Sequence, residues 1–248
     1  MMRRDSLQDE RLSVLGTLTA GLFHEICTPL TYVTMQVDLV DRKLNGFLER
    51  PSAAGAESLK RSLGHASEGL KRANAIIRDV RLFASLGEGE SVIQWVDLGD
   101  VIQSALTIAS VELRHYARVQ TDFAVLPLLR MNRSKIGQVF LNLFLNAAQA
   151  MQLSPSEMNC LQVKTNLGVG NSVVIEISDT GPGIDKSLQE RVFERFFTTK
   201  PSGTGLGLWI CREILQELQG TLEIVESNSS GTRVRVILPS ELAQSSAS

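Results

Sequence analysis

Hydrophobic residues recur at steps of three and four over the first third of the chain, which is the spacing of an amphipathic helix. Two steps of four fall together around Pro29, whose ring crowds the carbonyl of Glu25, so we predict a kink just past His24. A loop at Pro51–Gly55 separates two stripes. The first holds Leu12, Leu15, Leu18, Leu22, Ile26, Leu30, Val33, Val37, Val40, Leu44 and Phe47, and the second Leu59, Leu63, Ala66, Leu70, Ala73, Ile77 and Val80.

Two helices of this kind contain too little core to be stable alone. We therefore predict an antiparallel helical hairpin that packs against a second copy of itself, because a dimeric four-helix bundle buries both stripes. A homodimer is the expected state.

Beyond residue 87 the pattern changes to mixed helices and strands. It contains more strands than βαβ units require, so we predict an α+β fold, an α/β sandwich. The expected division is a helical domain at 1–86, a linker at 87–97, a second domain at 98–242 and a tail at 243–248. The expected helices lie near 98–113, 132–151 and 206–219, the strands near 119–124, 160–166, 172–178, 221–226 and 232–238, and a mobile stretch at 184–204.

Composition and charge narrow the classes of function. A net charge of −2 gives no basic character for nucleic acid, so no nucleic-acid partner is expected. Cys27, Cys160 and Cys211 form no zinc or disulfide pattern, which fits a cytoplasmic protein. We find no signal peptide and no apolar run long enough to span a membrane. The segment before the first apolar stripe is too short for a sensor domain. We therefore expect either that a separate protein is the sensor or that this chain is a piece of a larger one.

His24 and Glu25 are the first candidates for chemistry. On a helix, His24 is turned away from the apolar stripe and Glu25 has no oppositely charged helical partner. A carboxylate beside a histidine can accept its ring proton and leave the other nitrogen free to attack, whereas the alternative is a solvated surface histidine. Small residues surround His24 on its face: Ala20, Gly21, Cys27 and Thr28.

Asn142 and Asn146 lie one helical turn apart, with Gln138 and Gln149 on the same face. The segment 137–151 contains no charged residue, which indicates a half-enclosed polar site and not a solvated surface. Amide oxygens can bind Mg²⁺.

Asp179 ends an alternating strand just before Gly181 and Gly183. Its carboxylate can accept the exocyclic amine of adenine while the glycines let the backbone approach the base, although an ordinary turn aspartate is the alternative. A second glycine run leads into a helix, whose N–H groups and dipole can hold phosphates. This run is Gly203, Gly205 and Gly207, and it matches neither a Rossmann nor a Walker pattern.

Together, the stretch 23–30, Asn142 with Asn146, the stretch 179–183 and the stretch 203–207 resemble the H, N, G1 and G2 boxes of sensor histidine kinases. The resemblance covers about residues 10–240. It implies transfer of the ATP γ-phosphoryl group to a histidine, and then to an aspartate of a response-regulator receiver domain.

Residue by residue, the resemblance makes His24 the phosphoacceptor, Glu25 the base and Thr28 the residue needed to remove phosphate from the receiver. It makes Asn146 the stronger Mg²⁺ ligand, with Asn142 beside it.

The resemblance also implies that Thr232 supports Asp179. Many relatives have a lysine where this chain has Gln149, so Lys200, in a stretch that resembles an F box, is our candidate for the phosphate charge.

Two other functions stay open. A related ATPase would need a glutamate where this chain has Asn142, and a pseudokinase scaffold is suggested by Arg195 and Gln149. We interpret Cys27 as a small helix residue and not a redox group. The stimulus, the cognate receiver and the choice between cis and trans phosphorylation are not determined by the sequence.

Overall fold

The computed structural model describes residues 27–85, 92–114, 116–156, 158–200 and 203–239. The chain divides into two compact units. One comprises Met1–Gly87 with Thr198–Thr204, and the other comprises Glu88–Phe197 with Gly205–Ser248. We call them the helical unit and the α/β unit.

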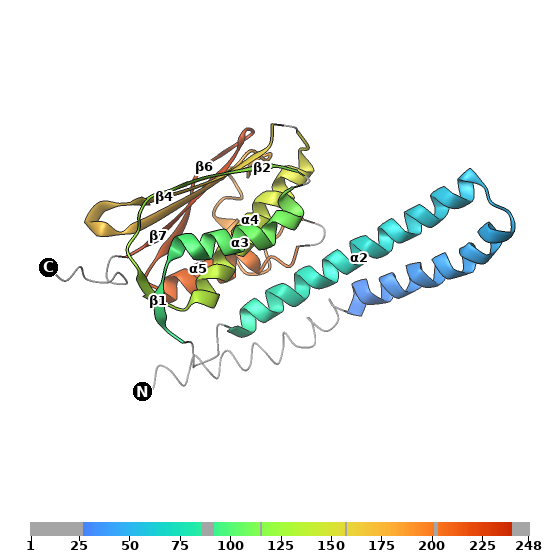
Figure 1. The fold of residues 1–248 in the computed structure, drawn as a ribbon, viewed down its shortest axis with the longest axis horizontal. Coiled ribbons are helices and arrows are strands. Elements are labelled where there is room, and N and C mark those ends of the chain that lie inside the picture. Colours follow the sequence, from blue (N-terminus) through green and yellow to red (C-terminus); the bar gives the residue numbers. More distant parts are fainter. Residues whose placement is uncertain (1–26, 86–91, 115, 157, 201–202, 240–248) are drawn as a thin grey trace. The chain divides into compact units, whose positions relative to one another are not determined.

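The helical unit is an antiparallel hairpin (Figure 1). A helix over residues 27–49 is followed by α2 (Ala53–Ser85), which begins within the loop predicted at Pro51–Gly55. Ser52 explains the early start, because its Oγ accepts the N–H of Gly55 at 3.1 Å, as an N-cap does. The rings of Tyr32 and His65 lie 6.4 Å apart between the two helices. The predicted hairpin is confirmed, and the kink predicted at Glu25 lies outside the described residues.

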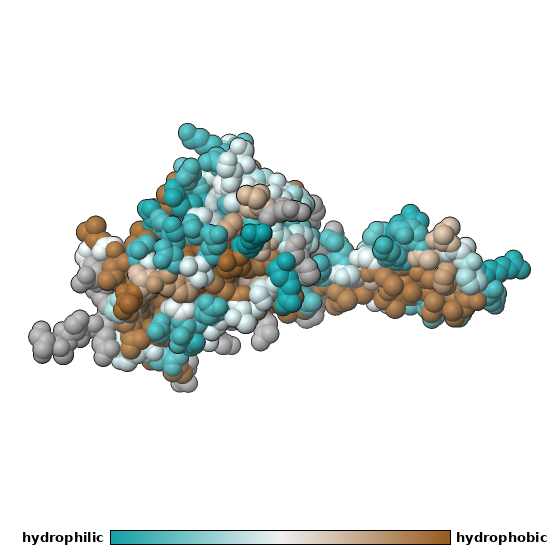
Figure 2. Space-filling view, turned by 45° about the horizontal axis from the view of Figure 1, so that its top comes forward, coloured by the Kyte–Doolittle hydropathy of each residue, from teal (hydrophilic) through white to brown (hydrophobic). Residues whose placement is uncertain are grey.

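Small and polar side chains form the seam between the two helices. Gln36 and Ser62 are 7% and 4% exposed, and Ala66 and Ala73 are buried beside them. Ile76 is buried as well, but many of the larger apolar residues of the hairpin are exposed, and Figure 2 shows hydrophobic residues gathered along one side of it. They are Leu30, Met35, Val37, Leu44, Leu48, Leu63, Leu70 and Ile77. Over the described part of the hairpin, one copy therefore leaves much of its apolar stripes exposed.

The α/β unit has two layers. Its five-stranded sheet has the order β2-β4-β5-β7-β6, in which β2 is parallel to β4 and the other neighbours are antiparallel. Three helices lie on one face of the sheet (Figure 1). This confirms the predicted α+β class. The strands are β2 (Arg118–Phe123), β4 (Cys160–Leu167), β5 (Val173–Asp179), β6 (Thr221–Asn228) and β7 (Gly231–Leu238), and the helices are α3 (Leu98–Leu113), α4 (Arg133–Leu153) and α5 (Gly207–Glu217).

Apolar and polar residues alternate along the strands, and this alternation gives the sheet one face covered by helices and one polar face. Val173, Ile175 and Ile177 of β5 are buried on the helix-covered face. The intervening Glu176 lies on the other face, where it accepts hydrogen bonds from Arg235 of β7 at 2.7 and 3.0 Å. These bonds raise the pKa of the Arg235 guanidinium. Cross-strand ion pairs thus keep the outer face polar.

Two strands were not predicted. β1 (Gln94–Val96) pairs antiparallel with β3 (Leu129–Met131), and β1 lies inside the range expected to be a linker. Each has three residues, too few to show a period of two, and they are held by the burial of Val96. Two short 3₁₀ helices are also present, η1 (Val169–Asn171) and η2 (Arg191–Phe193). No helix in the described ranges is long and apolar enough to cross a membrane.

Candidate functional site

One face of α4 carries the candidate site of the α/β unit. Asn142, Asn146 and Ala150 follow one another at steps of four and therefore share that face. An ideal Cβ on Gly207 would lie 2.7 Å from Asn142 Nδ2, and one on Gly181 would lie 2.9 Å from Ala150 Cβ. The start of α5 therefore packs at one end of this face and the loop after β5 at the other. Asn146 lies between them.

The amide of Asn142 is fixed by α5. The residue is 7% exposed, and its Nδ2 donates a hydrogen bond to Cys211 Sγ at 3.3 Å. Gly207 is required at the start of α5, because any side chain would collide with this amide. Asn146 and Gln149, by contrast, are half-buried. The predicted half-enclosed amide stripe therefore has one member, Asn142, inside the protein.

Asp179 is held at the end of β5 by its own loop. Its Oδ1 accepts the N–H of Gly181 at 2.8 Å. In the sheet it is paired with Thr232 of β7, whose Oγ1 lies 2.9 Å from Ser227 Oγ. Ser227 Oγ in turn accepts the N–H of Ile184 at 2.7 Å. The loop after Asp179 is thereby tied to β6 and β7.

Residue 183 must be glycine for a structural reason that the sequence did not reveal. Its φ is +77°, and an ideal Cβ would lie 2.0 Å from the carbonyl oxygen of Asn228. A side chain is therefore excluded by conformation and by space. Just beyond it, hydrogen bonds from the Ser187 hydroxyl and N–H lower the pKa of Asp185, which stays a carboxylate and holds the turn.

Arginine–aromatic pairs hold the segment 191–197 against α5. The guanidinium of Arg195 lies 4.2 Å from the ring centre of Trp209, and that of Arg212 lies 5.6 Å from Phe193. Our sequence reasoning missed these contacts and treated Arg195 only as a source of doubt. The alternation of arginine and phenylalanine in 191–197 was a signal that could have pointed to them.

Two predicted site residues, Lys200 and Gly203, are not part of the α/β unit. Lys200 and Gly203 form a turn, with a hydrogen bond from Gly203 N–H to the Lys200 carbonyl at 3.1 Å. They belong to the segment Thr198–Thr204, which is grouped with the helical unit, so their phosphate role stays a prediction. Gly205 lies in the α/β unit, just before α5.

The predicted phosphoacceptor region is described only in part. His24 and Glu25 lie outside the described residues. Thr28 is exposed on the helix over 27–49, next to the exposed Cys27.

Comparison with known proteins matches residues 131–242 to the family of histidine kinase-, DNA gyrase B- and HSP90-like ATPases. The sensor protein FixL of Bradyrhizobium diazoefficiens is 33% identical over 245 residues, which cover 96% of this chain and 47% of FixL. The signal transduction histidine-protein kinase AtoS of Escherichia coli is 30% identical over 241 residues, or 96% of this chain and 37% of AtoS. The chain thus spans less than half the length of these relatives.

A solved structure supports the fold. The histidine kinase ThkA in complex with the response regulator protein TrrA aligns with a TM-score of 0.66 at 23% identity, over 96% of this chain and 65% of that chain. The matched range 131–242 contains α4, the loop after Asp179 and α5, so the α/β unit is an ATP-binding domain of this ATPase class. Over 96% of its length the chain is similar to the sensor protein FixL and to the histidine-protein kinase AtoS.

Proposed function

We propose that the chain is the dimerisation and catalytic part of an ATP-dependent protein histidine kinase. It would phosphorylate itself on His24 and pass the phosphoryl group to an aspartate of a response-regulator receiver domain, from which it also removes phosphate. The observation that carries this proposal is the face of α4. There Asn142, Asn146 and Ala150 bring the start of α5 and the loop after Asp179 to one place, in a chain that aligns over 96% of its length with FixL.

The proposed chemistry is a phosphoryl transfer in two steps. A ring nitrogen of His24 attacks the γ-phosphorus of ATP, the bond to the ADP oxygen breaks, and Glu25 accepts the ring proton. The carboxylate of the receiver aspartate then attacks the phosphohistidine and the imidazole is released. For dephosphorylation of the receiver, the exposed Thr28 follows His24 by four residues in the sequence, and its hydroxyl would orient water against the receiver's phosphoaspartate.

The nucleotide would be bound by the α/β unit. We assign the exocyclic amine of adenine to the Asp179 carboxylate, which is fixed by Gly181 and supported through the pairing with Thr232. The loop through Gly183 would lie along the base. The phosphates are assigned to the N–H groups at the start of α5 and to the charge of Lys200. The glycine run of Gly203, Gly205 and Gly207 leads into this helix and would let the phosphates come close to the backbone.

Asn146 is our candidate for the main Mg²⁺ ligand. It is half-buried on the face between the two loops, and its amide oxygen is a donor that this ion accepts. Asn142 would hold the ion less directly, because its side chain is buried and is oriented by the hydrogen bond from Nδ2 to Cys211. When bound, Mg²⁺ would neutralise phosphate charge and align the γ-phosphoryl group.

The domain roles follow from this assignment. Residues 1–86 would form the dimerisation and phosphotransfer domain, 87–97 the linker and 98–242 the catalytic domain, followed by the tail at 243–248. The exposed stripe of the hairpin supports a homodimer. We place the chain in the cytoplasm, with its stimulus received by a separate sensor protein or by other domains of a longer chain.

The test is the variant His24→Gln. We expect it to lose stable phosphorylation from labelled ATP while ATP affinity changes by less than about twofold, because the nucleotide is bound by the other unit. In the wild type the label should be lost in acid and survive base, as a phosphohistidine does. Labelling of His65 or His115 in the variant would reject His24 as the phosphoacceptor.

A further inference from the structure

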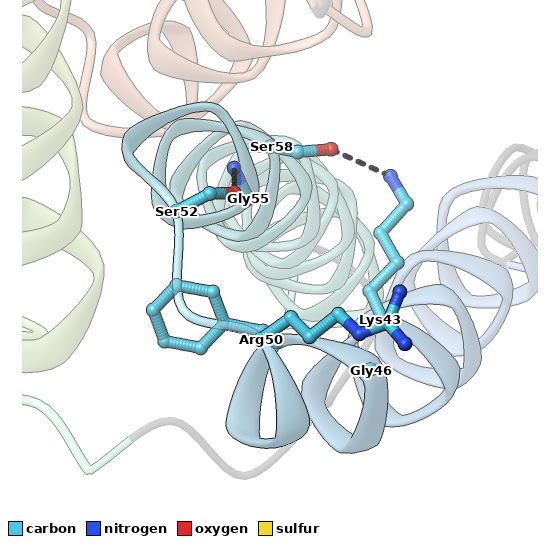
Figure 3. A pocket seen from close by; sticks show the side chains of 7 residues that line it. Lys43, Gly46, Arg50, Ser52, Gly55 and Ser58 are labelled. Atoms are coloured by element: carbon cyan, nitrogen blue, oxygen red, sulfur yellow. Dashed lines mark hydrogen bonds between the residues drawn. The ribbon is translucent and has the colours of Figure 1, made fainter.

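A cavity of about 280 Å³ lies at the turn of the helical hairpin. Figure 3 shows that it opens between the end of the helix over 27–49 and the start of α2. The ring of Phe47 forms one wall, and the other lining residues are charged, hydroxylic or glycine: Lys43, Gly46, Arg50, Ser52, Gly55 and Ser58.

The lining of this cavity is positively charged. Lys43 and Arg50 are two turns apart on the first helix, and no carboxylate lines the cavity. Lys43 Nζ donates a hydrogen bond to Ser58 Oγ at 2.9 Å, and no ion pair between described residues involves Lys43 or Arg50. Glu49 and Glu57 are near in sequence, but neither lines the cavity. Two like charges therefore share a space with no counter-charge.

Gly46 lines the cavity and is exposed. An ideal Cβ at this position would meet nothing within 4 Å, so the space beside it is open. Glycine inside a helix costs about 1 kcal/mol relative to alanine, so helix stability does not account for a glycine at this position. Gly55 forms the opposite side, where an ideal Cβ would lie 2.9 Å from the Phe47 ring.

We propose that this cavity binds a phosphate group, either as the free ion or as part of a small phosphomonoester. Lysine and arginine supply charge and donors, and arginine presents two parallel N–H groups that suit phosphate oxygens. The Ser58 hydroxyl adds a donor from α2. The volume exceeds that of a phosphate ion, and it leaves room against Phe47 for the group that carries the phosphate. The bound anion joins the two helices at their turn, since Lys43 and Arg50 belong to the first helix and Ser58 to α2.

The experiment is calorimetric titration of the full chain with inorganic phosphate and, separately, with glycerol 3-phosphate, in a buffer without other phosphates. We expect saturable binding and a rise in melting temperature that grows with ligand concentration, because the anion binds the folded hairpin. Arg50→Met should weaken binding about tenfold or more, as loss of a charged hydrogen bond does. Lys71→Met is the matched control, since Lys71 is an exposed cation of the same unit that does not line the cavity.

A second variant tests the space without removing charge. Gly46→Leu should abolish binding without lowering the melting temperature, because the new side chain enters open space in a helix. Gly64→Leu is its control, since Gly64 also lies in a helix with nothing within 4 Å of an ideal Cβ, and it should bind as the wild type does.

The results identify the form of phosphate that binds, and two outcomes would overturn the proposal. Equal affinity for the two probes would identify the free ion, and tighter binding of glycerol 3-phosphate would identify a phosphomonoester. The proposal is overturned if neither probe binds at millimolar concentration. It is equally overturned if binding is unchanged in both Arg50→Met and Gly46→Leu, because the phosphate would then occupy the nucleotide site of the α/β unit.

Discussion

Single side chains separate the two activities proposed for the phosphoacceptor helix. Thr28 is exposed, and forward transfer requires the imidazole, its base and ATP but no hydroxyl one turn away. Thr28→Ala should keep autophosphorylation within about threefold and slow dephosphorylation of the receiver about tenfold or more. Both rates can be measured on one preparation. If they fall in parallel, Thr28 shapes the helix before Pro29 and does not position water.

At the same scale, Cys211 positions the buried amide of Asn142. Cys211→Ala removes the acceptor of that amide and should lower the free energy of unfolding by about 1–3 kcal/mol, with weaker ATP binding, because a buried donor is left unpaired. Cys211→Ser keeps an acceptor and is the matched control. Denaturant unfolding and nucleotide titration of both variants provide the measurements. Equal losses in the two would mean that volume, and not the hydrogen bond, is what matters at this position.

At the scale of elements, the contact between Arg195 and Trp209 links the segment 191–197 to α5. A double-mutant cycle with Arg195→Met and Trp209→Leu should give a coupling energy of about 0.5–1 kcal/mol, because the cation of this cation–π pair is exposed to water. The pair Arg191 and Phe197, with 4.4 Å between guanidinium and ring centre, lies within the segment and serves as a comparison. A coupling near zero would show that Arg195 does not hold the segment to α5.

The elements were largely predictable because their patterns are long. β5 and α5 were expected at 172–178 and 206–219 and lie at Val173–Asp179 and Gly207–Glu217. The strands β1 and β3 were not, because three residues carry no period. In the site, the glycine runs and amides were visible in the sequence. The bond from Asn142 to Cys211 was not, since it joins residues far apart in the chain that only the packing of α4 on α5 brings together.

At the scale of the whole molecule, the exposed stripe of the hairpin predicts association. The full chain should be a dimer at micromolar concentration by light scattering, because two copies bury the apolar side chains that one copy exposes. Leu70→Glu should shift the chain toward monomer, since it places a charge in this stripe. Lys71→Glu, at the neighbouring exposed position, is the control and should remain dimeric. A monomeric wild type would contradict the four-helix bundle.

The strand order has a consequence for synthesis on the ribosome. β7 follows β6 in the chain but lies between β5 and β6 in the sheet. Until residues 231–238 have been made, β6 has no partner and β5 has an unpaired edge on the side away from β4. The strand edge of the nascent α/β unit therefore stays unpaired until β7 is synthesised. Chaperones or neighbouring nascent chains can bind to this edge before β7 pairs with it.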